Sequence, residues 1–344
     1  MATPFPGMFF RHVREMPAGR FPLPSHALQY PHGFFQRKRL KKCESLLKNR
    51  KSALNYTEYE HLTRVSQELP VDFNTDNLLQ KIITPPLVTE NDAYLLKFAE
   101  NEDEILAAQK LRYRVFNCEQ NRGLDSAKND EFDRDEFDEG AAHLIVFDKG
   151  NGMPIGTYRA IGQPGNAPDK MYSAREYEVN GIERYLPQII EVGRSCVDKD
   201  YRNGAVVAFL WSGMAAITLR SGCRYLCGCV SLEDACPSVA WAVYQSLRDK
   251  GLFFPDVDFK PRQRFSFQRP AQTEIDSILN DRAQLRAAMP PLLKGYITIG
   301  AKLLGEPAFD YEFGSIDLPV MVDMWHLPDR YHKHFFPNIT FPGD

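Results

Sequence analysis

A glutamate in an apolar segment is the first residue of this chain that could do chemistry. Glu191 lies between Ile190 and Val192 in the segment QIIEVGRSCV, which is typical of a buried strand. Burying a carboxylate there is costly unless it has a partner or a task. In a partly dry site it can act as a general base that takes a proton from an attacking group. Alternatively, Glu191 forms an ion pair with Arg194 or Arg159, and the two interpretations can both hold.

A basic, glycine-containing turn follows this segment and leads into a long apolar helical pattern. The turn consists of Arg202, Asn203, Gly204 and Ala205. The start of a helix offers free backbone N–H groups and the positive end of the helix dipole, so it can bind a phosphate group. The GxxxxGK[ST] pattern is absent, and the turn is too short for a dinucleotide fingerprint. An ordinary capped loop is the alternative.

An acidic stretch and a group of cysteines also invite a functional interpretation. Residues 130–139 carry seven carboxylates against Arg134, but no glycine stands where an EF-hand needs one. A solvated loop is the simplest reading of that stretch. The cysteines of residues 223–236 are spaced C-x3-C-x-C-x6-C, without the paired CxxC of zinc sites. We therefore expect buried free thiols at Cys223, Cys227, Cys229 and Cys236.

Short strands alternating with helices must position these residues. The apolar patterns predict an α/β fold with antiparallel hairpins mixed in. The turn DKGNG joins two of the predicted strands as a hairpin. The predicted strands are residues 94–98, 143–148, 155–161, 188–197, 224–231 and 318–324. The predicted helices are residues 102–120, 204–221, 237–250, 292–303 and a short final helix.

Composition limits the function classes. The chain has 344 residues and a formal net charge of -3, so a dedicated nucleic-acid binder is not expected. Seven cysteines, an odd number, indicate reduced thiols and a cytoplasmic protein. The longest apolar stretch, residues 205–219, is shorter than the roughly 20 residues that span a membrane. The first residues do not have the pattern of a secretory signal.

The N-terminal part differs from the rest, so we divide the chain into an extension, residues 1–85, and a main domain, residues 86–344. Six prolines among the first 31 residues indicate an irregular arm. Residues 37–51 carry eight basic residues and one acidic residue, a net charge of +7, with leucines at helical spacing. This basic segment could recruit an acidic partner, either a protein or an anionic membrane. It could equally be a solvated helix face.

Four segments carry a resemblance to the GNAT acyltransferase superfamily. They are LRYRVF (111–116) with the acidic residues 133–138, GTYR (156–159), EVGR (191–194) with YRNG (201–204), and PPLLKGY (290–296) with GEPAFD (305–310). The first three resemble the acyl-homoserine-lactone synthases. The fourth is similar to the ornithine-lipid N-acyltransferases, which are ornithine-acyl carrier protein N-acyltransferases. The resemblance covers residues 92–335, and residues 1–85 have no counterpart in it.

The resemblance implies a GNAT fold and an N-acyltransferase. A long-chain or 3-hydroxy fatty acyl group would pass from acyl carrier protein to the α-amine of ornithine or a similar amino acid, which forms a lyso-aminolipid. The donor would be an acyl-phosphopantetheine thioester, with no metal or redox cofactor. The alternatives are an acyl-homoserine-lactone-type or other N-acyl amino acid synthase and, from another class, an inactive acyl-carrier or membrane-binding module. The enzyme would work in the cytoplasm, with peripheral contact at the inner membrane as a further expectation.

The resemblance also implies roles for particular residues. The turn from Arg202 to Ala205 would hold the donor's phosphate, and Glu191 would be the base. Tyr244, on the helix after a core strand, would protonate the departing thiolate, although a core aromatic is the plainer reading. The amino-acid site would be lined by carboxylates and the arginines that pair with them. These residues are Asp135, Asp138, Arg114, Arg159 and Arg194.

Neutralising the basic segment distinguishes its possible partners. We expect a variant with Lys38, Arg39, Lys41 and Lys42 changed to Gln to have a higher KM for acyl carrier protein and an unchanged KM for a short thioester, because charge steers encounter. A membrane role predicts lost vesicle binding instead, since each basic residue contributes about 1 kcal/mol at an anionic surface. Wild-type behaviour in both the kinetic and the vesicle sedimentation assays would make the segment structural.

Overall fold

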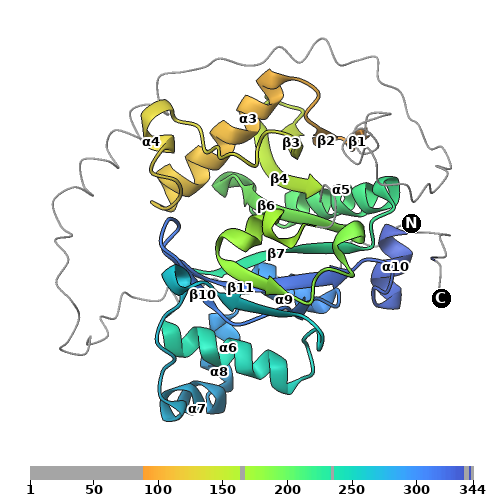
Figure 1. Ribbon diagram of the computed structural model, residues 1–344. Helices are drawn as coiled ribbons and strands as arrows, with labels where there is room; N and C mark the ends of the chain where they lie inside the picture. Colours follow the sequence, from red (N-terminus) through yellow and green to blue (C-terminus); the bar gives the residue numbers. More distant parts are fainter. Residues whose placement is uncertain (1–87, 163–166, 234–235, 337–340, 342–344) are drawn as a thin grey trace. The chain divides into compact units, whose positions relative to one another are not determined.

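The computed structural model describes residues 88–162, 167–233, 236–336 and 341, and its main feature is a mixed sheet (Figure 1). The strand order is β1-β2-β3-β4-β6-β7-β11-β10, and β9 pairs with β11. β6 and β7 are parallel, whereas the other neighbours in this sheet are antiparallel. The strands are β1 (Val88–Glu90), β2 (Tyr94–Phe98), β3 (Ala142–Asp148), β4 (Pro154–Gly162), β6 (Ile189–Val197), β7 (Tyr225–Leu232), β9 (Lys302–Leu303), β10 (Ala308–Asp310) and β11 (Ser315–Asp323). A separate pair joins β5 (Tyr177–Asn180) to β8 (Asp258–Pro261).

Helices cover the sheet, and their ends follow the local sequence. α3 (Glu102–Tyr113) begins where the Asn101 side chain accepts a hydrogen bond from the N–H of Glu104, and it continues into a π-helical turn, η2 (Arg114–Glu119). α5 (Ala205–Ser221) ends at Gly222, whose φ of 71° closes the helix in the left-handed region. The other α-helices are α4 (Ala127–Asp130), α6 (Pro237–Asp249), α7 (Gln272–Asn280), α8 (Arg282–Ala288), α9 (Pro291–Thr298) and α10 (Asp329–Phe335).

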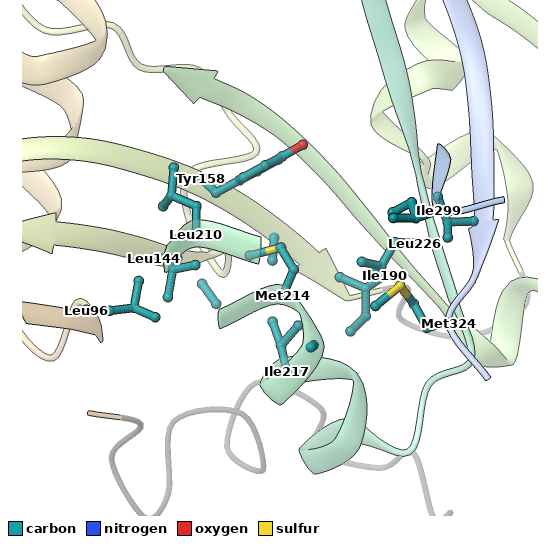
Figure 2. Packing of buried hydrophobic residues seen from close by; sticks show 14 of the residues in the cluster. Leu96, Leu144, Tyr158, Ile190, Leu210, Met214, Ile217, Leu226, Ile299 and Met324 are labelled. Carbon is teal, nitrogen blue, oxygen red and sulfur yellow. The ribbon is translucent and has the colours of Figure 1, made fainter. Parts of the chain in front are cut away.

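The two faces of the sheet have separate apolar cores because side chains alternate along each strand. Helix α5 contacts β2, β3, β4 and β6; its Met214 lies beside Ile190, and its Leu210 lies beside Leu144 and Tyr158 (Figure 2). Ile189, next to Ile190 on β6, and Cys227, next to Leu226 on β7, belong instead to a second cluster of buried apolar residues. That second cluster packs beneath the β5–β8 pair and includes Met171, Tyr177, Phe259 and Met321.

The sheet loses its regular pairing near the middle of β6. The register between β4 and β6 shifts between Thr157 and Arg159, and Arg194 takes a positive φ of 49° there. This is a bulge on β6, which bends the strand and redirects a side chain. The parallel register of β6 with β7 ends at Glu191 and Cys227, although both strands continue. Glu191, the carboxylate within an apolar segment of the sequence, therefore lies where β6 and β7 stop pairing.

The predicted α/β pattern is confirmed, including the β3–β4 hairpin and the long helix that ends at Gly222. The helix predicted for residues 292–303 is too long, because α9 ends at Thr298. Gly300 has a φ of 98°, and the chain then forms β9 instead of a further helical turn. The predicted extension and its basic segment lie outside the described residues, so the boundary at residue 85 stays a prediction. Within the described part of the chain, no helix is both long and apolar enough to cross a membrane.

Gly228 permits the close approach of β6 and β7 at the residue that follows their last paired position. A Cβ atom added there would lie 2.3 Å from the backbone oxygen of Val192, whereas one added at Gly193 would meet nothing within 4 Å. We expect Gly228→Ala to lower the free energy of unfolding by about 1–3 kcal/mol, because the backbone must shift. Gly193→Ala is the matched control, with a much smaller effect. Urea unfolding of both variants measures this, and equal losses would mean that the approach is not tight.

Candidate active site

Three arginines and three aspartates form a buried charge cluster against β4 and β6. They come from α3, from the loop between α4 and β3, from β4 and from the bulge of β6. We call this set the Arg–Asp cluster. Its members are Arg112, Asp133, Asp135, Asp138, Arg159 and Arg194, each with less than a tenth of its side chain exposed.

Each carboxylate of the Arg–Asp cluster contacts two guanidinium groups. Asp138 also accepts two hydrogen bonds from one of them. Arg112 donates from both terminal nitrogens to Asp138, at 2.9 and 2.8 Å, and its Nε lies 2.9 Å from Asp133 Oδ1. Arg159 Nη1 lies 2.6 Å from Asp135 Oδ1 and 3.3 Å from Asp138 Oδ1. Arg194 reaches Asp133 at 3.2 Å and Asp135 at 3.1 Å. The three positive and three negative charges balance, as buried charges must.

The arginines keep Asp135 and Asp138 ionised. Burial would raise the pKa of Asp138, but hydrogen bonds and charge from Arg112, together with Arg159, lower it to about 2. Burial would also raise the pKa of Asp135, but the charges of Arg159 and Arg194 hold it below its ordinary value. His143 lies beside them, and burial together with the charge of Arg112 lowers its pKa to about 4. The histidine is therefore neutral near pH 7.

The structure corrects one member of the predicted set. Arg114 lies outside the Arg–Asp cluster, since it donates to Asp198 Oδ2 at 2.7 Å and to the carbonyl of Pro154 at 3.3 Å. Arg112 takes the place that we expected Arg114 to fill. The physical reason is local: Arg112 is on the buried face of α3, whereas Arg114 begins the π-helical turn and is a quarter exposed. Both arginines are in the LRYRVF segment, so the signal was present but the face was misassigned.

Glu191 is held by the backbone of a neighbouring turn. The backbone N–H groups of Tyr172 and Ser173, in the 3-10 helix η4 (Tyr172–Arg175), donate to its two carboxylate oxygens. Its side chain is almost fully buried, and burial raises its pKa despite these hydrogen bonds. The predicted alternative, an ion pair with Arg194 or Arg159, is wrong, because both arginines bind aspartates instead.

Tyr172 joins Glu191 to the Arg–Asp cluster. Its hydroxyl accepts a hydrogen bond from Arg194 Nη1 at 2.8 Å, and its ring meets the Phe137 ring edge-on at 5.1 Å between centroids. The guanidinium groups of Arg159 and Arg194 lie over the same ring, at 5.1 and 5.4 Å from its centroid. The buried base candidate and the ion cluster are thus one connected site, and Tyr172 is a residue that sequence reasoning missed.

The turn before α5 is ordered by its own side chains. Gly204 caps the helix with a φ of 89°, and the Asn203 side chain accepts a hydrogen bond from the N–H of Ala205 at 3.0 Å. Arg202 donates to the carbonyl of Val197 at 3.0 Å and forms an ion pair with Glu119. The turn therefore lies at the N-terminus of a long helix, as predicted, with its arginine partly engaged by a carboxylate.

Tyr244 is placed away from this site. Its ring packs edge-on against Trp241, at 5.3 Å between centroids, and its hydroxyl accepts a hydrogen bond from Arg248 at 3.4 Å, all within α6. Another tyrosine pair lies in the apolar core that α5 covers. The hydroxyls of Tyr158 on β4 and Tyr296 on α9 are in direct contact. Both tyrosines belong to segments that carried the resemblance, GTYR and PPLLKGY, and only their pairing was unforeseen.

The cysteines do not gather into a zinc site within the described residues. Six of them lie there and all are free thiols. Cys223 and Cys227 are buried as expected, Cys229 is half-buried, and the expectation of a buried thiol is wrong for Cys236, which is exposed. The potential metal-binding group found in this part of the chain joins Cys229 with two carboxylates instead of other cysteines.

Comparison with known proteins places this site in a class. Residues 111–212, which run from α3 to the middle of α5, match the acetyltransferase (GNAT) domain family. They carry Arg112, the acidic loop, Arg159, Glu191, Arg194 and the turn before α5. The protein is therefore an acyltransferase with the GNAT fold.

Similar proteins of known name identify the family within this class of acyltransferases. The chain is 30% identical over 248 residues to the L-ornithine N(alpha)-acyltransferase of Agrobacterium fabrum. The aligned part covers 70% of this chain and 84% of that protein. It is 29% identical over 249 residues to the enzyme of the same name from Brucella abortus, covering 70% and 88%. The chain belongs to this N-acyltransferase family. A solved N-acyl amino acid synthase from uncultured soil microbes is 11% identical, covers 70% of this chain and 92% of that one, and has a TM-score of 0.39, too low to add to the assignment.

The correction from Arg114 to Arg112 is testable. Arg112→Met would leave Asp133 and Asp138 buried with fewer partners, so we expect a loss of about 3–5 kcal/mol in the free energy of unfolding. Arg114→Met removes a pair at the surface and is expected to cost less than about 1 kcal/mol. Urea unfolding of the two variants compares them. Similar losses in both would contradict the assignment of Arg112 to the cluster.

Proposed function

We propose that the protein transfers a fatty acyl group from the thioester of acyl carrier protein to the α-amine of ornithine and so forms a lyso-aminolipid. The names of its relatives support this substrate. The observation that carries the proposal is Glu191: a buried carboxylate with a raised pKa, at the point where β6 and β7 stop pairing. A base of this kind suits an amine that must lose a proton near neutral pH.

The reaction needs two proton transfers. The ammonium group of the acceptor gives a proton to a base, and its nitrogen attacks the thioester carbonyl carbon. A C–N bond forms, the C–S bond breaks, and the departing thiolate takes a proton. In our proposal Glu191 accepts the first proton. Tyr244 is the candidate from the sequence for the second. The Tyr158–Tyr296 pair is a further candidate, because Tyr158 lies on β4, next to β6, and its hydroxyl contacts that of Tyr296.

The remaining predicted site residues divide by their contacts. Asp135, Asp138, Arg159 and Arg194 use their charges on one another, so we propose that they position the acceptor site by fixing the acidic loop and β6. The turn from Arg202 to Ala205 is proposed to hold the donor's phosphate at the start of α5. Arg202 would then exchange its ion pair with Glu119 for the phosphate.

The donor and the place of action are also proposals. We favour acyl carrier protein over coenzyme A because the basic residues 37–51 suit an acidic protein partner or an anionic membrane surface. We propose action in the cytoplasm, with peripheral contact at the inner membrane, where a lipid product would enter. No metal, redox cofactor or nucleic acid takes part in the proposed reaction. Another N-acyl amino acid product, including a lactone-type one, is the alternative within the enzyme class.

Expression in a host that lacks aminolipids tests the proposal. We expect acyl-ornithine in the lipid extract by mass spectrometry with wild-type protein, and turnover lowered by about 10²–10⁴-fold in the Glu191→Gln variant with purified acyl carrier protein and ornithine. A different acylated amino acid would support the alternative product. No acylated amine at all would support the inactive module.

The pH profile separates the base from a structural role of Glu191. The side-chain amide introduced by Glu191→Gln would place its N–H₂ group against one of the two backbone N–H donors, so some loss of thermal stability is expected in any case. If Glu191 is the base, the wild-type kcat/KM rises with pH through the raised pKa of this carboxyl group, and the variant loses this limb. A variant that is slower but keeps the same limb would leave Glu191 as a structural anchor.

A further inference from the structure

Three further carboxylates are buried beside the active site, close enough to Arg194 for its charge to act on two of them, but not in an ion pair with it. Glu176 precedes β5, Asp310 ends β10, and Asp317 lies in β11. The ligand atoms of Glu176, Asp317 and Cys229 are all within 4.8 Å of one another. We call Glu176, Asp310 and Asp317 the acid cluster. Each is at most 7% exposed, and within the described part of the chain none of them forms an ion pair with lysine, arginine or histidine.

The hydrogen bonds of the acid cluster are incomplete. Asp310 Oδ1 accepts from the backbone N–H groups of Glu312 and Phe313, at 2.7 and 3.2 Å. Asp317 Oδ1 accepts from the Ser315 hydroxyl at 3.0 Å. The Oε2 atom of Glu176 is buried and has no hydrogen-bond partner among the residues that the structure describes. Because an unpartnered buried oxygen is costly, this atom indicates a ligand that is absent from the structure.

The charge balance points to a cation. Burial, and then the neighbouring Asp317 and Asp310, raise the pKa of Glu176 well above its usual value. Burial and Asp310 raise the pKa of Asp317 to about 6. The Arg–Asp cluster, by contrast, matches each aspartate with arginine. The negative charge that was expected on Asp135 and Asp138 is neutralised there, whereas carboxyl groups without a cationic partner in the described part of the chain lie in the acid cluster, where a bound cation would favour their ionised form.

The acid cluster shares a sheet face with Glu191. Glu191 is in register with Cys227 on β7, and side chains two residues apart lie on the same face, so Cys229 is the next residue along that face. Asp317 is in register with Ser231, one step further. At about 3.3 Å per residue, these positions lie about 7 and 13 Å along the strand from the level of Glu191. They extend along the part of β7 that no longer pairs with β6.

We infer that the acid cluster binds the side-chain ammonium group of the amino-acid acceptor. The inference rests on the proposed function, in which the α-amine reacts near Glu191. The short alkyl side chain of ornithine then carries a second ammonium group, and the buried, unpartnered oxygen of Glu176 on the same face is an acceptor for its N–H donors. An amino acid without a charged side chain would leave this oxygen and its neighbouring carboxylates uncompensated, so the acid cluster selects a cationic acceptor.

A partly exposed ion pair joins the two segments that border the acid cluster. Two segments border it, η4 before Glu176 and the turn between Asp310 and Ser315. They meet through Arg175 and Glu312, whose nitrogen and oxygen are 3.8 Å apart and whose side chains are both about a third exposed or more. An exposed ion pair of this length contributes little stability.

A pair of matched acceptors tests the inference. L-norvaline has the carbon skeleton of L-ornithine without the side-chain amine, and both are offered with the same acyl carrier protein thioester. We expect Glu176→Gln and Asp317→Asn to lower kcat/KM for ornithine by about 10- to 100-fold, the worth of a hydrogen bond to a charged group, while kcat/KM for norvaline stays the same or rises. Glu178→Gln is the matched control, because Glu178 is an exposed carboxylate two residues from Glu176. It should leave both rates unchanged.

Thermal unfolding supplies a readout without turnover. Ornithine should raise the Tm of the wild-type protein and of Glu178→Gln, and it should fail to raise the Tm of the two acid-cluster variants. In the absence of ligand, Glu176→Gln should be at least as stable as the wild type, because it removes like-charge repulsion from a buried site.

The outcomes separate this inference from the proposed function. Suppose that the wild-type protein acylates ornithine and that both variants still prefer ornithine to norvaline. This result would overturn the role of the acid cluster in binding the ammonium group, while the proposed function would stand. Wild-type protein that acylates norvaline but not ornithine would overturn the proposed function itself. A stoichiometric metal in the purified wild-type protein that both variants lose, measured by elemental analysis, would make the acid cluster a metal site and overturn the ammonium assignment.

Discussion

The pairing of three buried arginines with three buried aspartates is the interaction on which the rest of the site depends. Charges of this kind can stay dry only if each finds a partner, because the cost of removing an ion from water exceeds most single interactions in a protein. Arg112, Arg159 and Arg194 come from a helix, a strand and a bulge, and all of their partners in the cluster lie in the loop of residues 133–138. The loop, in turn, contacts Tyr172, whose backbone N–H helps to hold Glu191. Removing one arginine therefore disturbs the loop, the η4 turn and the carboxylate together.

Charge balance also distinguishes the two groups of acids near the opening of the sheet. The aspartates of the Arg–Asp cluster each form ion pairs with arginines, which offset their charge within the protein. Among the described residues the acids of the acid cluster have no arginine partner, and burial together with the neighbouring carboxylates raises the pKa of Glu176 and of Asp317. The acidic residues that lie close together in the sequence, in the loop of residues 133–138, thus stabilise the fold through their ion pairs with arginines. Acidic residues brought together only by the fold lack arginine partners in this part of the chain, and a cationic ligand would favour their ionised form.

The sequence predicted the framework better than the site. Alternating apolar residues, the DKGNG turn and Gly222 gave the strands, the hairpin and the end of α5, because these features depend on local periodicity and backbone freedom. Glu191 could be identified for the same reason, as a charge within an apolar run. The choice between Arg112 and Arg114 depended on where α3 changes into a π-helical turn, and periodicity does not reveal such a change. The acid cluster could not be predicted, because Glu176 and Asp317 are far apart in the chain and meet only through the pairing of β11 with β7.

The alternation of side chains explains why the proposed chemistry belongs at the end of the β6–β7 pairing. On one face of β6 and β7, Ile190 and Leu226 join the apolar core beneath α5, where Tyr158 and Tyr296 also pack. On the other face, Glu191 adjoins the two charged clusters. A fatty acyl thioester suits the first environment and an amino acid the second, so a sheet that stayed paired would keep the reactants apart. The register ends at Glu191 and Cys227, so the proposed reaction belongs beyond the last paired residues. The bulge at Arg194 is therefore as much a part of the proposed site as the carboxylate beside it, since it bends β6 while its own side chain supports the charged face.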